Sequence, residues 1–282
     1  MELVDQCLYV GSSDGRIFMY SLQSISDHEL QGTSRVNDPK SEGKSLGFGK
    51  KASVDCLISH PDQGRLLVLC HENVTVHKLK DLELLSAPKA LKGSSLMCAG
   101  KIDGKLYVAT INKKKLELMV WEMDQNSKDG VTPAPAFARP LDVKRLTDRC
   151  SGTPMRMSMC GSSICIGYEK GYVMFQNVVA GPVGEQNLDH LPPVVAPYLM
   201  TMNDTDMLVS CEEMGMILEA GNGMPAPGKP PLMIGEGVPM AFARSPPYVV
   251  ALFPTHIDVF NVDKGQKVQV RETRSPAARM GG

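Results

Sequence analysis

Four residues in one short stretch of the chain are of the types that bind zinc: Cys56, His60, Cys70 and His71. One Zn²⁺ ion takes four such ligands in tetrahedral geometry, so this set is a candidate metal site. Cys70 and His71 are adjacent, however, and neighbouring residues of a strand point to opposite faces of its sheet. We therefore expect no shared metal ion here, and we expect no cofactor elsewhere in the chain.

Phosphate binding and catalysis are the next chemistries to test. Gly43-Lys44-Ser45 resembles the end of a phosphate-binding loop, but Asp38 stands where that motif has its first glycine, and no strand-to-helix unit surrounds it. No nucleophile lies in a glycine-rich elbow. The spacing of residues cannot reveal a Ser-His-Asp triad, because triads assemble in space. We expect no enzymatic activity and nominate no catalytic residue.

Two triplets match the acceptor pattern for N-glycosylation, Asn73-Val74-Thr75 and Asn203-Asp204-Thr205. We expect neither to be modified, because other features of the sequence indicate a cytosolic chain. No apolar stretch is long enough to span a bilayer, and the amino terminus lacks the layout of a secretory signal. Eight cysteines are spread singly along the chain. We expect reduced thiols that behave as small buried hydrophobes.

The overall charge gives no reason to expect a nucleic-acid or lipid ligand. The 282 residues carry a formal net charge of −1, with an isoelectric point near 6.6. A polyanion therefore has no bulk attraction for the chain. Lys113-Lys114-Lys115 is the densest basic cluster, and we interpret it as a solvated hairpin tip that protects a strand end.

The element that the rest of the chain repeats is the stretch Arg65 to Leu79. An apolar run, Leu66 to Leu69, is followed by the polar residues His71, Glu72 and Asn73 and then by an alternating run. β-branched residues and a period of two are typical of a half-buried strand, so the stretch predicts a β-hairpin.

The same pattern occurs six times. Its apolar runs begin at Leu8, Leu66, Leu106, Ile164, Met207 and Val249, at spacings of 58, 40, 58, 43 and 42 residues. A period of about 40 residues is that of a four-stranded propeller blade. The sequence therefore predicts an all-β, WD40-like β-propeller, with an antiparallel sandwich as the alternative. Each long spacing contains a polar stretch, and we expect loop insertions at 23–50 and 124–139. The proline-rich segment 223–231 cannot form a central strand.

One known family resembles this chain in its motifs. The run SLGFGKKASVDCLISHPDQGRLLVLCHENVTVHKLKDLEL (45–84) is similar to the amino-terminal citron homology (CNH) domain of the TGF-beta receptor-associated protein and Vps3 family. That family has an LGF-KK stretch before an RLLVLC hairpin. LYVGSSDGRIFMYSL (8–22) and PPYVVALFPTHIDVFNVDKGQKVQ (246–269) resemble its first and last hairpins. The similarity over 94–240 rests on the hairpin pattern alone.

The resemblance implies a seven-bladed propeller at the amino end of a CORVET vesicle-tethering subunit, with a related HOPS subunit as nearest relative. It implies Rab-type small GTPases and other tether subunits as partners, and peripheral association with the early or late endosome or the vacuole. The alternative is an adaptor that binds a TGF-beta-type receptor's cytoplasmic domain or its downstream mediator. Only six hairpins are visible. We therefore expect residues 1–282 to form one CNH domain with an incomplete last blade, the amino-terminal part of a larger protein.

Overall fold

Twenty-five strands and two single-turn 3-10 helices make up the regular structure of the described residues. The computed structural model describes residues 1–4, 7–21, 46–47, 52–112, 115–123, 131–135, 141–142, 153–179, 181–192, 196–211, 213–235 and 237–272. The short helices are η1 (Pro61–Gln63) and η2 (Lys89–Leu91). Within these ranges, no helix has the length and apolar character that a membrane crossing needs.

The chain divides into two compact units. The first unit consists of Met1–Ala99 and Gly104–Leu141, and the second of Gly100–Asp103 and Asp142–Gly282. Each unit contains three antiparallel sheets that follow one another along the chain. In each sheet, a hairpin predicted from the sequence supplies the two middle strands, so all six hairpins are confirmed.

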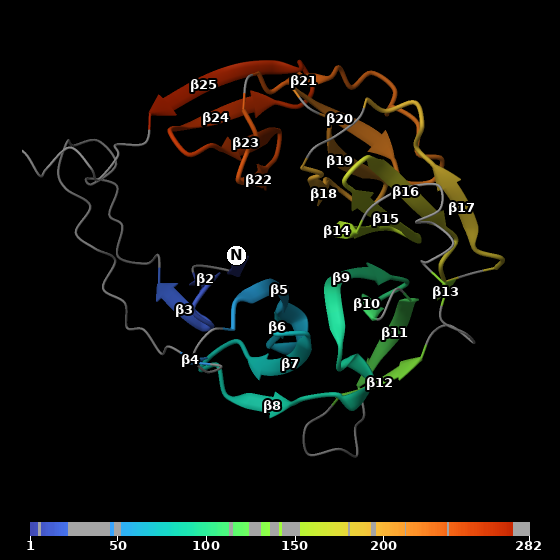
Figure 1. Cartoon of the computed structure of the whole chain (residues 1–282). Helices are drawn as coiled ribbons and strands as arrows, with labels where there is room; N and C mark the ends of the chain where they lie inside the picture. The colour runs from blue at the N-terminus through green and yellow to red at the C-terminus, as the bar shows by residue number, and fades with distance from the viewer. Residues whose placement is uncertain are drawn as a thin grey trace, which may run out of the picture. The chain divides into compact units, whose positions relative to one another are not determined.

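The first unit contains the three sheets coloured blue to green in Figure 1. Sheet 1 is β1 (Glu2–Val4), β2 (Cys7–Gly11), β3 (Arg16–Ser21) and β4 (Leu46–Gly47); sheet 2 is β5 (Val54–His60), β6 (Arg65–Cys70), β7 (Asn73–Lys78) and β8 (Leu84–Ser86). Sheet 3 is β9 (Ser94–Ile102), β10 (Lys105–Asn112), β11 (Lys115–Met123) and β12 (Val131–Pro135), with β13 (Leu141–Asp142) also paired to β11.

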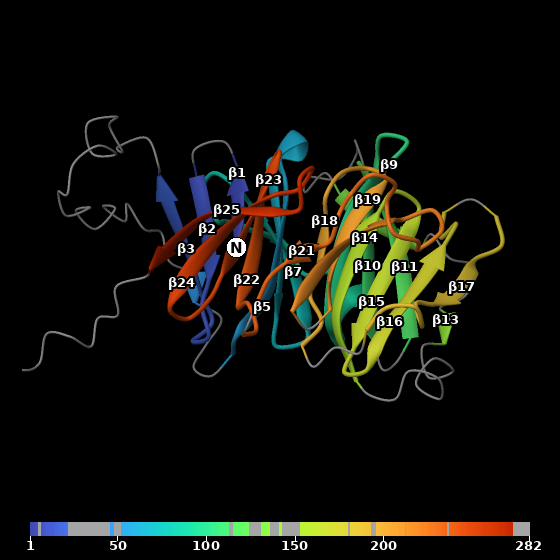
Figure 2. The same cartoon turned by 90° about the horizontal axis from the view of Figure 1, so that it is seen from above.

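The second unit has the same plan, and strands such as β15 and β16 run side by side in both Figure 1 and Figure 2. Sheet 4 is β14 (Pro154–Cys160), β15 (Ser163–Tyr168), β16 (Gly171–Gln176) and β17 (Gly184–Asn187); sheet 5 is β18 (Leu199–Thr201), β19 (Asp206–Cys211), β20 (Met214–Glu219) and β21 (Leu232–Met233). Sheet 6 is β22 (Ala241–Ser245), β23 (Tyr248–Leu252), β24 (His256–Asn261) and β25 (Gln266–Glu272).

The hairpin of sheet 2 shows why these sequences turn where they do. β6 and β7 pair from Cys70↔Asn73 to Arg65↔Lys78, which leaves only His71 and Glu72 in the turn. Both residues have positive φ, 50° and 58°. Positive φ at both central positions is the two-residue hairpin geometry that matches the right-handed twist of the strands.

Apolar side chains fill the space between neighbouring sheets within each unit. In the first unit, one core contains Ile17 and Leu66 between sheets 1 and 2, and another contains Leu67 and Val108 between sheets 2 and 3. Sheet 2 is therefore covered on both faces, which explains why Leu66 to Cys70 are all buried. Sheet 5 of the second unit is covered in the same way by two cores.

Three expectations from the sequence need correction. The described residues form six sheets, five with four strands and one with five, so the implied seven blades are not found there. The last of them is not incomplete, because the polar stretch Gln266–Glu272 forms the outer strand β25. The expected insertions 23–50 and 124–139 contain short outer strands at Leu46–Gly47 and Val131–Pro135. Prolines are tolerated in the latter because outer strands leave one edge unpaired. The remainder of both insertions lies outside the described residues.

Candidate interaction surface

A pocket of about 480 Å³ opens between sheets 5 and 6 of the second unit. It lies where the turns β18–β19, β22–β23 and β24–β25 meet. Met202, Ile217 and Val262 supply its apolar lining, and charged side chains surround them. A concave site with apolar walls and few polar groups is the usual form of a binding pocket. We call this pocket the sheet 5–6 groove.

The first wall of the groove is a turn that its own side chains hold in place. The Asn203 side-chain oxygen accepts hydrogen bonds from the backbone N–H groups of Thr205 at 2.8 Å and Asp206 at 2.7 Å. Asn203 in turn donates to the Asp206 carboxylate at 2.9 Å. Asparagine is common in turns because its side chain can replace a backbone acceptor in this way. The triplet that matches a glycosylation acceptor is thus a turn element in the structure.

The opposite wall comes from sheet 6 and carries the cation Arg244. Arg244 pairs in register with Val249, which is buried in the core between sheets 5 and 6. Antiparallel partners share one face of a sheet, so Arg244 lies on the face turned toward sheet 5. Lys229 and Asp263 form an ion pair across the groove lining. Arg244 has no ion-pair partner among the described residues.

The rim next to Arg244 is apolar and exposed. Pro246 and Pro247 form the β22–β23 turn and Tyr248 begins β23. The Tyr248 side chain remains 39% exposed, and Met240 close by in the chain is 56% exposed. Arg and Tyr are the residue types that most often anchor protein partners. Among the described residues, the groove therefore offers an apolar platform beside the Arg244 guanidinium group.

A second pocket of about 420 Å³ occupies the corresponding place in the first unit, between sheets 1 and 2. Arg65, Lys78 and Lys80 line it together with Tyr9. The Tyr9 hydroxyl donates to the Leu79 carbonyl at 2.8 Å, and Lys78 pairs with Glu83. The repeat thus generates a pocket at equivalent turns, with different charges in each copy.

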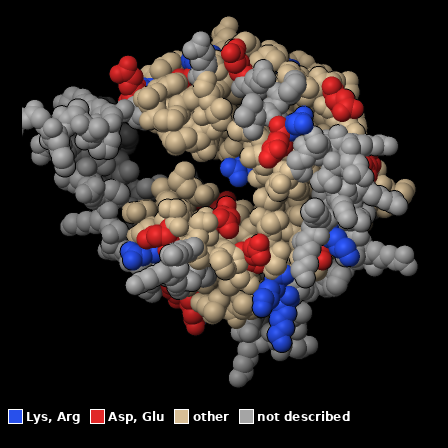
Figure 3. Space-filling view, in the orientation of Figure 1, with Lys and Arg blue, Asp and Glu red and all other residues tan. Residues whose placement is uncertain are grey.

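Charges of both signs are scattered over the face of the molecule shown in Figure 3. No large area of one sign stands out among the coloured residues of that face. This distribution agrees with the near-zero net charge and gives no support to a polyanion ligand.

The structure separates the four candidate zinc ligands. Cys70 and His60 are buried, whereas His71 lies exposed in the turn. Cys56 directs its thiol toward the carbonyl of Met97 at 3.6 Å. In the described part of the chain, no group of three or more potential ligands is placed to hold a metal ion. The Gly43-Lys44-Ser45 motif lies outside the described residues.

Several cysteines of the described residues are buried free thiols, as the sequence predicts, and their reactivity can be measured. None of the cysteines in the described residues forms a disulfide. Burial, together with Asp206 and Asp204, raises the pKa of the Cys160 thiol to about 12. Burial also raises the pKa of Cys165 far above its ordinary value. Cys7, by contrast, is partly exposed.

We expect Cys160 and Cys165 to resist alkylation in the folded chain. At pH 8, a thiol with a pKa of about 12 is ionised in roughly one molecule in ten thousand, and the thiolate is the nucleophile. Iodoacetamide labelling followed by peptide mass spectrometry should show Cys7 modified first. Equal labelling of all three before unfolding would contradict the burial described above, and labelling in urea is the control.

The groove, the apolar rim and the stacked four-stranded sheets together define a propeller-type scaffold that presents binding pockets at its turns. The match to the CNH domain family covers residues 4–277, so the chain belongs to that family. The likeness to solved structures agrees. The CNH domain of AfRom2 matches with a TM-score of 0.57 at 18% identity, covering 96% of this chain and 82% of that one. The fold is therefore an all-β, WD40-like β-propeller, which excludes the sandwich alternative.

Two further comparisons point the same way. The WD40 domain of Neurospora crassa Pan2 matches with a TM-score of 0.57 at 12% identity, covering 97% of this chain and 77% of that one. The Vam6/Vps39-like proteins of Mus musculus and Homo sapiens are 23% identical over 296 residues. That alignment covers 96% of this chain but only 29% of the relatives' length.

Proposed function

We propose that this chain is the CNH module of a vesicle-tethering subunit of the HOPS or CORVET type, and that it binds protein partners without catalysis. The observation that carries the proposal is the match along almost the whole chain to the CNH family and to Vam6/Vps39-like proteins. Fold alone does not define function. The proposal therefore needs a test of partners.

The finer part of the proposal names the partners. We propose that the module works with a Rab-type small GTPase and with other tether subunits, which would bring it to the endosome or vacuole membrane. The LGF-KK stretch that begins at Leu46 favours the CORVET side, as the resemblance to the TGF-beta receptor-associated protein and Vps3 family implies. A rigid scaffold that holds loops and turns is a common way to present such a surface.

The sheet 5–6 groove is the surface we assign to this contact. Its cation Arg244 can pair with an acidic side chain of the partner, and Tyr248 with the two prolines can cover an apolar one. Central Arg and Tyr residues contribute most to binding when they are shielded from water by the surrounding contact. The module would bind the GTP-bound form of a GTPase in preference to the GDP-bound form, because the γ-phosphate orders the GTPase's switch segments.

We expect the chain to retain an early-endosomal or late-endosomal Rab in the GTP-analogue form and not in the GDP form. Arg244→Glu should weaken this capture by about tenfold or more, because it replaces an attraction in the contact by repulsion. The matched control is Lys170→Glu, the same charge change at an exposed hairpin turn of the same unit. Capture would be measured by pull-down with each Rab in both nucleotide states.

The outcomes separate the two parts of the proposal. Nucleotide-dependent capture that is equally strong for Arg244→Glu and Lys170→Glu would support the Rab partner and reject the groove. Capture of no Rab, with binding of a TGF-beta-type receptor's cytoplasmic domain, would reject the tether function in favour of the adaptor.

A further inference from the structure

The wall that sheet 5 contributes to the sheet 5–6 groove carries two acidic side chains next to each other. Asp206 lines the groove, and it pairs in register with Glu219 on β20. Antiparallel partners lie on one face of a sheet, with their Cβ atoms about 5 Å apart. The next pair on the same face is Leu208 with Ile217, and both belong to the core between sheets 5 and 6. Both carboxylates therefore lie on the face turned toward sheet 6.

Uncharged side chains hold these two carboxylates in place. The Asn203 amide donates to Asp206 at 2.9 Å, and the Asn222 amide donates to Glu219 at 2.5 Å. Among the described residues, neither carboxylate forms an ion pair. Like charges directly opposite on neighbouring strands destabilise a sheet. A cation from a partner would offset this repulsion, and it would meet carboxylates that are already ordered.

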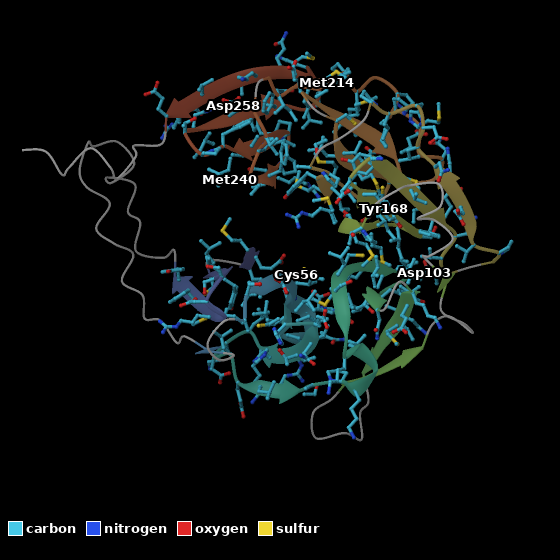
Figure 4. The ribbon with its side chains drawn as sticks, viewed as in Figure 1. Cys56, Asp103, Tyr168, Met214, Met240 and Asp258 are labelled. Carbon is cyan, nitrogen blue, oxygen red and sulfur yellow. The ribbon has the colours of Figure 1, made fainter. Side chains whose placement is uncertain are left out.

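Another acidic side chain of the same unit shows the opposite arrangement. Asp258 on β24, labelled in Figure 4, is fully buried, and its carboxylate lies 2.5 Å from the Lys267 amine. The chain thus supplies Asp258 with a cation of its own. In the groove, Lys229 is likewise already paired with Asp263. The negative charge that remains on this side of the groove is that of the two carboxylates of sheet 5.

The wall that sheet 6 contributes has the opposite charge. Arg244 lies on the face turned toward sheet 5, and it lines the groove together with Asp206 without forming an ion pair with it. The rest of the lining includes the apolar side chains of Met202, Ile217 and Val262. The groove thus combines a negative wall, a positive wall and apolar surface. Complementary charges on a partner select that partner and fix its orientation.

We propose that the sheet 5–6 groove binds a segment of a protein partner that presents a basic, an apolar and an acidic side chain on one side. The basic side chain lies against Asp206 and Glu219, the apolar one on the lining of the groove, and the acidic one against Arg244. This inference rests on the proposed function, because that function assigns the groove to partner contact. It adds the basic side chain, which sets the direction in which the segment lies.

Segments with charges of one sign fit the groove less well. A segment with only acidic side chains brings negative charge toward Asp206 and Glu219, and a segment with only basic side chains brings positive charge toward Arg244. Like charges brought together at an interface cost affinity. The arrangement of charges in the groove therefore favours a segment that carries both signs.

The test uses three dye-labelled peptides with blocked ends, whose binding is followed by fluorescence anisotropy. The mixed peptide is Lys-Thr-Leu-Thr-Glu, and the other two carry glutamate or lysine at both charged positions. Alternate side chains of an extended chain point the same way, and threonine favours that conformation. We expect the mixed peptide to bind about threefold more tightly than either of the others, because each of those replaces one attraction by a repulsion.

Charge changes in the groove should alter the preference among the peptides in opposite directions. Arg244→Glu should weaken binding of the mixed peptide and make the lysine peptide the tightest of the three. Glu219→Gln keeps an acceptor for the Asn222 amide but removes a negative charge, so it should weaken the mixed peptide and improve the glutamate peptide. Because it also relieves a like-charge contact, it should not lower the melting temperature. Lys170→Glu, at an exposed turn, should leave the order unchanged.

Three results would overturn the proposal. One is a mixed peptide that shows no saturable binding or binds no more tightly than the glutamate peptide. Another is an order of binding that Arg244→Glu leaves unchanged, since the peptides would then occupy another surface. The third is a concentration-dependent dimer that Arg244→Glu dissociates, which would assign the groove to a second copy of the chain. These measurements contain no Rab, so failed Rab capture with the expected order of peptides would reject the Rab partner and support this inference.

Discussion

Replacing Lys267 with methionine should lower the free energy of unfolding by about 3 kcal/mol, because Asp258 would be left charged and fully buried without its main partner. Removing one member of a buried ion pair usually costs about 3–5 kcal/mol. The lower end applies here, since the Lys267 side chain is 36% exposed and water already screens part of the pair. Urea unfolding monitored by circular dichroism would measure the change.

The double variant Asp258→Asn with Lys267→Met provides the control. It removes the buried charge that the single variant leaves unpaired, so we expect it to recover at least half of the lost stability. If the double variant were less stable than Lys267→Met, the Asp258 carboxylate would stabilise the fold even without Lys267 as its partner, and the prediction would be wrong. A matched surface pair, Lys78 with Glu83, should leave stability nearly unchanged when Lys78 is replaced by methionine, because water screens both charges.

Replacing Tyr172 with alanine should lower the free energy of unfolding by about 4 kcal/mol, which is the largest effect that we expect from a single substitution. Tyr172 is 1% exposed in the core between sheets 4 and 5, and removing a buried aromatic ring leaves a cavity that costs about 3–5 kcal/mol. Its hydroxyl also donates a hydrogen bond to the Ser210 carbonyl, which joins the two sheets. Burial raises the pKa of this hydroxyl, so it remains protonated and able to donate at neutral pH.

Tyr172→Phe separates the two contributions. It keeps the ring and leaves the Ser210 carbonyl without this donor, which should cost about 1–2 kcal/mol. Urea unfolding of both variants at pH 7 would give the two values. If Tyr172→Phe and Tyr172→Ala lowered the free energy of unfolding by the same amount, the lost hydrogen bond would account for the whole effect. That result would contradict the contribution expected from the buried ring. Tyr248→Ala, at an exposed tyrosine of the same unit, is the control and should change stability little.

Local patterns in the sequence predicted the repeating unit correctly. A hairpin joins residues that are close in the chain, so its apolar period and its turn residues lie together in the sequence. Leu66 to Leu69 predicted a strand before any tertiary contact was known, and β6 with β7 confirms it. The spacing of such hairpins was also enough to predict the propeller class, because each blade needs about the same length of chain.

The outer strands were harder to predict. The last blade was expected to be incomplete, because an exposed strand such as β25 needs no apolar face and leaves no burial signal in its sequence. Val131–Pro135 was interpreted as a loop because of its prolines, although an outer strand tolerates them. Both errors affected residues whose strand state depends on pairing with a neighbour.

The class of fold, the six hairpins and the resemblance to the CNH family could be predicted from the sequence, because all of these depend on short-range patterns or direct motif similarity. Which charged side chains meet could not be predicted, because that depends on the packing of the sheets. Lys229 pairs with Asp263 across 34 residues, and Arg244 comes to lie in a groove whose other wall is the turn at Asn203. No local spacing reveals such contacts, since they arise only when two sheets pack face to face and bring distant turns to the same end.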